Sequence, residues 1–243
     1  MVELSIPDSC ILFALQREAR PFFREFPIQV KISHAPTPAW LCGNAGSSIL
    51  VVETGVGRER MEQALAWLAS QQGLPKLIIS AGFSGALRDG LSIGDIIVAT
   101  EVANEDGTLW PAPWPGELSG QAFQRGKLLT MSRFVPTPEE KRALAQKHDA
   151  VAVDMETAIV ARMCSQHGIP FGCVRAISDD VRTSLSDLDY VVINGRIAPW
   201  RLATRLLRRP WFAAELWRLA RHTRLAADRL SVALRQLIPV PAD

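Results

Sequence analysis

The chain has 243 residues, of which 48% are hydrophobic and 21% are charged, and its formal net charge is +2. This length and composition are typical of a soluble globular protein, and they are sufficient for one large α/β domain with a substantial core. The four cysteines are scattered, without Cys-x-x-C spacing or histidine partners at metal-ligand spacing, which argues against a disulfide framework and a zinc site.

Two further features of the sequence concern location. No stretch reaches the roughly 18 uninterrupted apolar residues of a membrane-spanning helix. The N-terminus is acidic and its apolar run is short, unlike a signal peptide. Together with the expectation of reduced thiols, these features predict a cytoplasmic protein.

Short β-rich segments alternate with helical patterns along the first 180 residues. Strands are expected at residues 10–15, 48–54, 77–81, 95–100, 128–131, 151–153 and 171–177, and helices at residues 17–26, 58–72, 137–146 and 155–167. This alternation predicts a single α/β domain with a central mixed twisted sheet flanked by helices. Residues 101–126, which are rich in Pro, Gly and Trp, are expected to form a long loop that serves as a lid, a binding loop or an interface.

From residue 196 the pattern changes to helix, and Pro210 is expected to divide it into two helices. Ten arginines against three acidic residues give residues 196–243 a net charge of +7, which leaves −5 for residues 1–195. Either the leucines of this tail pack on the sheet with the arginines in solvent, or the tail is a basic amphipathic surface for membranes or anionic partners. No nucleic-acid-binding motif is present. We divide the chain into a catalytic domain, 1–195, and a basic helical extension of it, 196–243.

Residues 151–180 are the most informative part of the sequence. Glu156 opens a helix directly after the short strand at 151–153, and Asp179 lies just past the end of the buried strand at 171–177. In open α/β sheets, ligands bind at the C-terminal edge of the strands, so both carboxylates are candidate site residues. Taken alone, Glu156 also fits a helix N-terminal carboxylate, and Asp179 fits a loop cap.

Two glycine-rich turns follow expected strands, at residues 54–57 and 80–87. Glycines let the backbone approach a ligand closely, and the N–H groups of such turns suit a phosphate or sugar oxygen. Neither turn matches a Walker or Rossmann fingerprint, and either could be a tight turn only.

Several of these segments together resemble the nucleoside phosphorylase and nucleosidase superfamily, which includes purine nucleoside phosphorylases and methylthioadenosine/S-adenosylhomocysteine nucleosidases. Val153-Asp154-Met155-Glu156 looks like the family's Val-Asp/Glu-Met-Glu motif, and Arg175-Ala176-Ile177-Ser178-Asp179 looks like its Arg-x-Ile-Ser-Asp motif. The glycine turns and Leu91 to Val98 are similar to further family motifs. The resemblance covers about residues 10–180.

The resemblance implies an enzyme that cleaves the N-glycosidic bond of a purine nucleoside. It assigns protonation of the leaving base to Asp179, which must then hold a proton at neutral pH through burial or nearby carboxylates. It assigns the ribose hydroxyls and the cationic sugar to Glu156, and activation of water to Glu18, in a segment similar to the nucleosidases' Ala-Met-x-x-Glu. The substrate-binding residues that it implies are Met155, Ser178, Phe134, Val135, Arg175, Ser84 and Gly82. It implies no metal and no organic cofactor.

The choice between hydrolysis and phosphorolysis depends on the nucleophile. A phosphorylase has to hold a phosphate dianion, commonly with arginines and a hydroxyl-bearing glycine loop. Glu18 favours water, and Phe83 stands where a small hydrogen-bonding residue would suit phosphate better. Ser84, Arg58 and Arg88 keep phosphate open as a co-substrate.

The tail resembles a more specific branch. Asn194-Gly195-Arg196 and the later Leu-Leu-Arg-Arg-Pro at 206–210 look like the hopanoid-associated phosphorylase/nucleosidases, which are thought to remove adenine from the lipid-linked nucleoside adenosylhopane. A basic tail with tryptophans would bring such an enzyme to an anionic membrane surface, here the inner membrane.

Other functions stay open on the sequence alone. The chain could be a phosphate-dependent purine nucleoside phosphorylase, a methylthioadenosine/S-adenosylhomocysteine nucleosidase, or a nucleoside-binding module without catalysis. The presence of Glu18, Glu156 and Asp179 together argues against the binding module. The family resemblance also implies a homo-oligomer, at least a dimer.

Overall fold

The structure is a computed structural model that describes residues 7, 9–43, 48–71, 73–115, 118, 123–193, 196–197 and 199–238. One ten-stranded mixed sheet forms its centre. The strands are β1 (Ser9–Phe13), β2 (Ile28–Lys31), β3 (Ala39–Cys42), β4 (Ile49–Glu53), β5 (Leu77–Ala86), β6 (Ile96–Asn104), β7 (Leu109–Pro111), β8 (Gln124–Thr130), β9 (Ala152–Asp154) and β10 (Phe171–Asp179).

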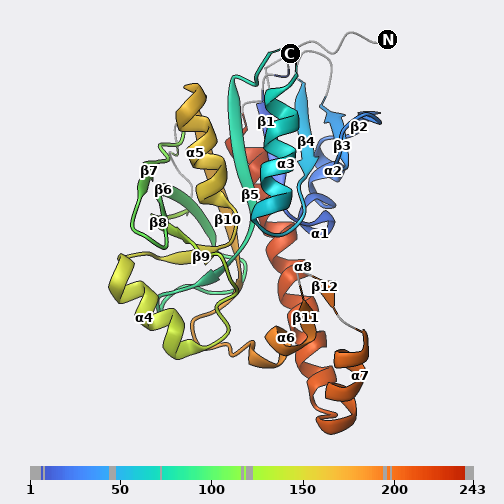
Figure 1. Cartoon of the computed structure of the whole chain (residues 1–243), viewed down its shortest axis with the longest axis vertical. Coiled ribbons are helices and arrows are strands. Elements are labelled where there is room, and N and C mark those ends of the chain that lie inside the picture. The colour runs from blue at the N-terminus through green and yellow to red at the C-terminus, as the bar shows by residue number, and fades with distance from the viewer. Residues whose placement is uncertain are drawn as a thin grey trace.

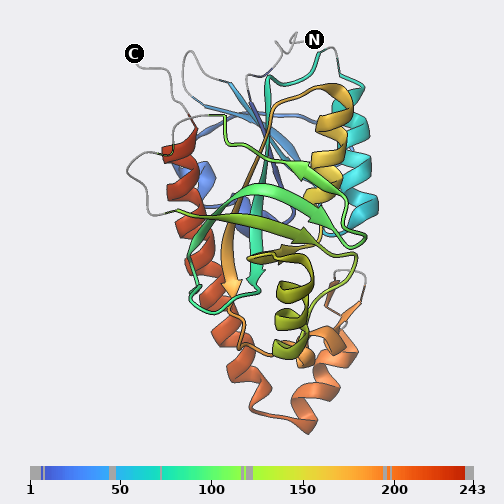
Figure 2. The same cartoon turned by 90° about the vertical axis from the view of Figure 1, so that its left-hand side faces the viewer.

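Strand β5 connects the two halves of the sheet. It pairs in parallel with β1 on one side and with β10 on the other, and its last residues pair with β9. Because β10 also pairs with β6, β6 with β8, and β8 with β9, these strands and β5 form a closed ring. Figure 2 shows β6 and β8 running across β5 and β10.

Helices cover both faces of the sheet, as expected (Figure 1). The helices α3 (Arg58–Ala69) and α5 (Thr157–His167) pack on one face, and α1 (Gln16–Ala19), α2 (Phe22–Glu25) and the second half of α8 (Phe212–Leu237) pack on the other. The alternation of side chains along a strand separates the two cores. In β1, Cys10 and Leu12 join the first core, whereas Ile11 and Phe13 join the second.

Three expectations about the elements are wrong in detail. The helix expected at residues 17–26 is divided into α1 and α2, because Pro21 has no N–H for a hydrogen bond within a continuous helix. The glycine-rich turn expected at residues 80–87 is strand, because β5 continues to Ala86 in pairing with β10 and β9. The long loop expected at residues 101–126 is partly strand: β6 continues to Asn104, β7 pairs with it, and β8 begins at Gln124.

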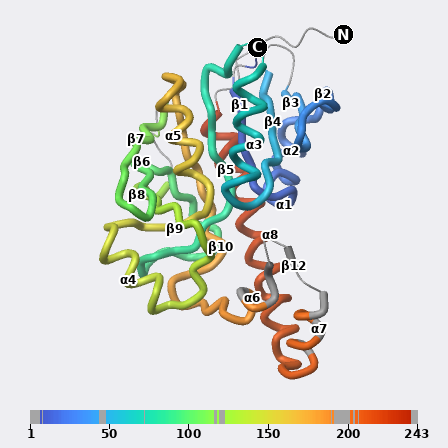
Figure 3. The backbone as a smooth tube through the Cα atoms, viewed as in Figure 1, coloured from blue at the N-terminus to red at the C-terminus, as the bar shows by residue number. Residues whose placement is uncertain are grey.

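The two parts of the tail differ in how they pack. After α6 (Ser186–Val191) and a short β11–β12 hairpin (Val192–Ile193 and Arg196–Ile197), α7 (Pro199–Arg208) and α8 are separated at Pro210, as expected. The second half of α8 buries Leu230, Leu234 and Leu237 against the sheet. Its first half extends beyond the sheet beside α6 and α7 (Figure 3).

The extending part of the tail leaves large apolar side chains in solvent. Leu207, Trp211 and Trp217 are 84%, 60% and 64% exposed. Among the helices of the described residues, none is long and apolar enough to cross a bilayer. The boundary between a domain at 1–195 and an extension at 196–243 stays a prediction, and the second half of α8 shares its core with β1, β5 and β10.

Candidate active site

The predicted site residues gather where β5, β9 and β10 meet. Gly82 of β5 pairs with Arg175 of β10, and Gly85 pairs with both Asp179 of β10 and Val153 of β9. The motif at 153–156 and the motif at 175–179 are therefore neighbours, although about twenty residues separate them along the chain. Both lie at the end of β10, the edge at which α/β sheets bind ligands.

Glu18 lies in α1, on the face of the sheet opposite to α5, and its side chain reaches Gly82 of β5. Its two carboxylate oxygens accept hydrogen bonds from the backbone N–H of Leu15, at 2.8 Å, and of Phe83, at 3.0 Å. A side chain at Gly82 would have its Cβ 3.0 Å from Glu18 Oε1 and 3.0 Å from Arg175 Nη1, so glycine makes room for both charged groups. Burial raises the pKa of Glu18 above its usual range, although the Phe83 N–H and the Arg175 charge oppose the shift.

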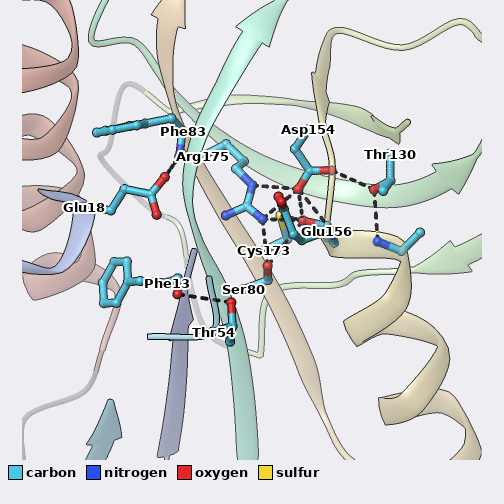
Figure 4. A network of polar contacts seen from close by, with 12 residues as sticks. Phe13, Glu18, Thr54, Ser80, Phe83, Thr130, Asp154, Glu156, Cys173 and Arg175 are labelled. Carbon is cyan, nitrogen blue, oxygen red and sulfur yellow. Dashed lines mark hydrogen bonds and ion pairs between the residues drawn. The ribbon is translucent and has the colours of Figure 1, made fainter. Parts of the chain in front are cut away.

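Arg175 is held by Asp154 in the middle of the site. Its Nη2 and Nε lie 2.7 Å and 3.1 Å from Asp154 Oδ2, and Nη2 also donates to Ser80 Oγ at 2.8 Å. Asp154 accepts a further bond from Thr130 Oγ1 at 2.7 Å. Figure 4 shows Arg175 between Glu18 on one side and Asp154 with Glu156 on the other. Because the pair is buried and both Nε and Nη2 of Arg175 are bound, its role is to fix the positions of its neighbours.

Glu156 lies at the N-cap position of α5, one residue before the helix begins. Its Oε1 accepts a hydrogen bond from the backbone N–H of Gly57, at 2.9 Å, so the first glycine turn and the motif at 153–156 are in contact. Burial and the negative charge of Asp154 raise the pKa of Glu156 to about 7.

This shift makes the stability of the protein depend on Glu156 between about pH 4.5 and pH 7. A carboxyl group with a raised pKa stabilises the fold fully below its unfolded value, and that stabilisation is lost as the pH rises through the folded value. A glutamine at 156 is neutral throughout. We therefore expect Glu156→Gln to gain stability over the wild type by on the order of 3 kcal/mol between pH 4.5 and pH 8.

Urea unfolding at pH 5 and at pH 8 measures this gain, and Glu59→Gln, on the exposed face of α3, is the matched control. Equal pH dependence in the wild type and in Glu156→Gln would contradict the assignment of a buried, proton-binding Glu156.

Asp179 has a cation as its closest charged neighbour. Lys141, in the helix α4 (Pro138–His148), is completely buried, and its Nζ lies 2.6 Å from Asp179 Oδ2. The other oxygen, Oδ1, is 2.8 Å from the hydroxyl of Ser178. The sequence led us to expect burial or nearby carboxylates around Asp179; the residue is buried, and its charged neighbour is a lysine.

Ser84 and Ser178 lie beside Asp179. The Ser178 hydroxyl also contacts the backbone oxygen of Ser84, at 3.3 Å. The hydroxyl of Ser84 is buried and has no hydrogen-bond partner among the residues that the structure describes. A buried, unpaired hydroxyl is costly, so it is a natural contact for a bound ligand or an ordered water.

The remaining predicted binding residues are spread more widely. Met155 borders a cavity of about 570 Å³ between the β6–β7 turn and the first turns of α3 and α5. Phe134 is half-buried in the segment between β8 and α4, while Val135 is buried in a small core with Leu87. The cavity is lined by Arg58, Asn104, Glu105, Asp106, Thr108, Trp110, Thr130, Met131, Ser132, Met155, Ala158, Ile159 and Arg162.

Two residues of the site were missed from the sequence. In the sequence, Asp154 is visible only as part of the motif at 153–156, and the resemblance assigns its partner Arg175 to substrate binding. Lys141 gave one usable signal: it lies three and four residues before Leu144 and Ala145, which face a core, so a charged residue occupies the buried side of its helix. Within the described ranges, no group of three or more His, Cys, Asp or Glu side chains is arranged to hold a metal ion.

The chain is similar to known proteins in sequence and in fold. Residues 10–208 match the family model described as the phosphorylase superfamily. The chain is 26% identical over 176 residues to the 5′-methylthioadenosine/S-adenosylhomocysteine nucleosidase of Shewanella sp. (strain MR-7), a match that covers 61% of this chain and 74% of that protein. A nucleosidase of the same name from Bacillus cereus (strain B4264) is 26% identical over 161 residues, 56% of this chain and 69% of that protein.

Two solved structures from Helicobacter pylori have a similar fold. The 5′-methylthioadenosine/S-adenosylhomocysteine nucleosidase superposes with a TM-score of 0.73 at 18% identity, over 96% of this chain and 98% of that chain. The futalosine hydrolase superposes with a TM-score of 0.74 at 17% identity, over 96% of this chain and 97% of that chain. The expected fold class is confirmed, including the helix at the C-terminal end.

Proposed function

Because this chain belongs to the phosphorylase superfamily, we propose that it is an adenine nucleosidase that hydrolyses the N-glycosidic bond of a 5′-substituted adenosine. The resemblance found in the sequence is confirmed at the level of this superfamily, as is the expectation of an enzyme that cleaves glycosidic bonds of nucleosides. One observation supports the more specific proposal best: the buried carboxylates of Glu18 and Asp179 lie against Gly82 and Gly85 of the same strand.

The proposed reaction uses the two carboxylates on the two sides of the broken bond. Asp179 gives a proton to N7 of the purine while the C1′–N9 electron pair moves to the base. Glu18 takes a proton from the water that attacks C1′, and burial makes it the stronger base. Glu156, beside the Gly57 N–H, accepts hydrogen bonds from the ribose hydroxyls. The reaction as proposed needs only these side chains and water.

The placement of Arg175 supports hydrolysis over phosphorolysis. Nε and Nη2 of its guanidinium are bound by Asp154, and the Glu18 carboxylate lies on its other side, where a negative charge disfavours a phosphate dianion. The unpaired Ser84 hydroxyl is the feature that suits a phosphate oxygen, and phosphorolysis is therefore the second candidate.

Incubation with adenosine, methylthioadenosine and S-adenosylhomocysteine, with and without phosphate, tests the proposal. We expect chromatography to detect free adenine in both conditions. Release that depends strictly on phosphate would favour the phosphorylase, and binding of nucleosides without any base release would favour a binding module.

We further propose that the 5′ substituent is a lipid, as in adenosylhopane, and that the enzyme works as a cytoplasmic protein at the inner membrane. The projecting part of the tail, which consists of α6, α7 and the first half of α8, supports this proposal. Thr183 and Leu188, which closely follow Asp179, share a small cavity with Phe212 and Leu219 of α8, so the projecting part lies on the side of the sheet where β10 ends. Its exposed Leu207, Trp211 and Trp217 are accompanied by the exposed arginines Arg208, Arg218, Arg221 and Arg224.

Not every arginine of the tail contributes to such a surface. Arg205 and Arg209 form ion pairs with Asp187, and Arg201 donates to the backbone oxygen of Tyr190. The four exposed arginines each contribute about 1 kcal/mol of salt-sensitive attraction near an anionic surface, and the two tryptophans suit the interfacial region.

We therefore expect the protein to co-sediment with vesicles containing phosphatidylserine at low salt. Replacing Trp211 and Trp217 with serine should reduce the bound fraction several-fold and leave cleavage of soluble nucleosides unchanged. Val232→Ser is the matched control, since Val232 is exposed on the half of α8 that packs on the sheet. If the protein does not co-sediment with these vesicles at low salt, the proposed membrane contact is wrong.

A further inference from the structure

Lys141 is a charged residue that the proposed reaction does not yet use. The residue is completely buried, and its Nζ donates three hydrogen bonds: to Asp179 Oδ2 at 2.6 Å, to the backbone oxygen of Asp180 at 2.8 Å, and to the backbone oxygen of Thr183 at 3.2 Å. An ammonium group has three N–H bonds and no lone pair. All three donors are therefore used, and the group is held as a cation in one position.

The two oxygens of Asp179 consequently have different partners. Because an ammonium group can only donate, Oδ2 must accept, and a proton on Oδ2 would leave the weaker acceptor facing the cation. Oδ1 faces the Ser178 hydroxyl, which can donate or accept. When Oδ1 is protonated, the Ser178 hydrogen can turn to the backbone oxygen of Ser84, which lies 3.3 Å away. The site therefore favours a proton on Oδ1 over one on Oδ2.

We propose that Lys141 is a positioning residue for the glycosidic cleavage, which directs the transferable proton of Asp179 to Oδ1 and stabilises the carboxylate left behind. The inference rests on the proposed function. In the step, the Oδ1–H bond breaks and an N7–H bond forms, while the C1′–N9 electron pair passes to the base. Asp179 becomes an anion, and the ammonium group is already in place beside it, so this charge develops next to a fixed cation.

A purely structural role for Lys141 is the alternative, since its other two bonds connect α4 to the turn at Asp180 and Thr183. The two roles differ in one consequence. A residue that acts through Asp179 loses its influence on the rate once Asp179 can no longer give a proton, whereas a structural role affects any variant to the same extent.

The test compares kcat and KM for adenine release in Lys141→Gln, Lys141→Arg, Asp179→Asn and the double variant Asp179→Asn/Lys141→Gln. Lys147→Gln, exposed on the same helix, is the control. We expect Lys141→Gln to lower kcat by about 10- to 100-fold with little change in KM, and Lys141→Arg, which keeps the charge, to recover part of this loss. The double variant should have the kcat of Asp179→Asn.

Several results would overturn the proposal: wild-type kcat in Lys141→Gln, a loss in the double variant that multiplies the two single losses, or full activity in Asp179→Asn. If Lys141→Gln proves too unstable for assay, the same comparison is made with Lys141→Arg, alone and together with Asp179→Asn. Failure of the proposed function is a separate result, namely no base release by the wild type.

Discussion

Asp179→Asn is expected to lower the rate of adenine release by about 10²- to 10⁴-fold while KM changes little. An asparagine side chain has the same shape as aspartate, and its amide oxygen can still accept the bond from Lys141 Nζ, 2.6 Å away in the wild type. It cannot give a proton to N7, so the loss falls on the transition state and not on substrate binding.

Steady-state kinetics with methylthioadenosine measure this loss, and isothermal titration with a non-cleavable analogue confirms that binding persists. The matched control is Asp89→Asn, since Asp89 is exposed and bound to Arg182. A near-normal kcat in Asp179→Asn would mean that the leaving base receives its proton from another group.

Glu18→Gln is expected to abolish hydrolysis to a similar extent, by about 10²- to 10⁴-fold in kcat. The glutamine cannot take a proton from water. It also offers one acceptor where the glutamate offers two, so either the Leu15 N–H or the Phe83 N–H loses its partner. We therefore also expect a loss of about 1–3 kcal/mol in the free energy of unfolding.

Two observations separate loss of catalysis from loss of structure in this variant. Thermal unfolding shows whether Glu18→Gln remains folded at the assay temperature, and added phosphate shows whether the nucleophile has been identified correctly. If Glu18→Gln retained full activity in phosphate buffer, the nucleophile would be phosphate and the water-activating role of Glu18 would be wrong.

Much of the fold could be predicted from the sequence because strands and helices of the central sheet have strong local patterns. The apolar runs of β1, β4 and β10 and the helix stop at Gly168 are local signals of this kind. Long-range strand pairing leaves no such local signal in the sequence. The lengths of β5 and β6 depend on the ring that they form with β8, β9 and β10. The tail likewise has one sequence pattern throughout, yet within its described residues only the second half of α8 packs on the sheet.

The residues of the candidate site also divide into those with a local signal in the sequence and those without one. Glu156 and Asp179 could be found because each lies in a short motif at the end of an element. Their partners could not, since Gly57 contacts Glu156 across 99 residues and Lys141 contacts Asp179 across 38 residues. Such contacts depend on how the elements pack, and a buried lysine on a helix is visible only after the core face of that helix is known.

The most direct test of an adenine nucleosidase is the fate of the oxygen from water. The enzyme is incubated with methylthioadenosine in ¹⁸O-labelled water with phosphate present, and the sugar product is analysed by mass spectrometry. Hydrolysis through Glu18 predicts free adenine and a sugar with one ¹⁸O at C1. A sugar 1-phosphate without the label, or an unchanged nucleoside, would contradict it.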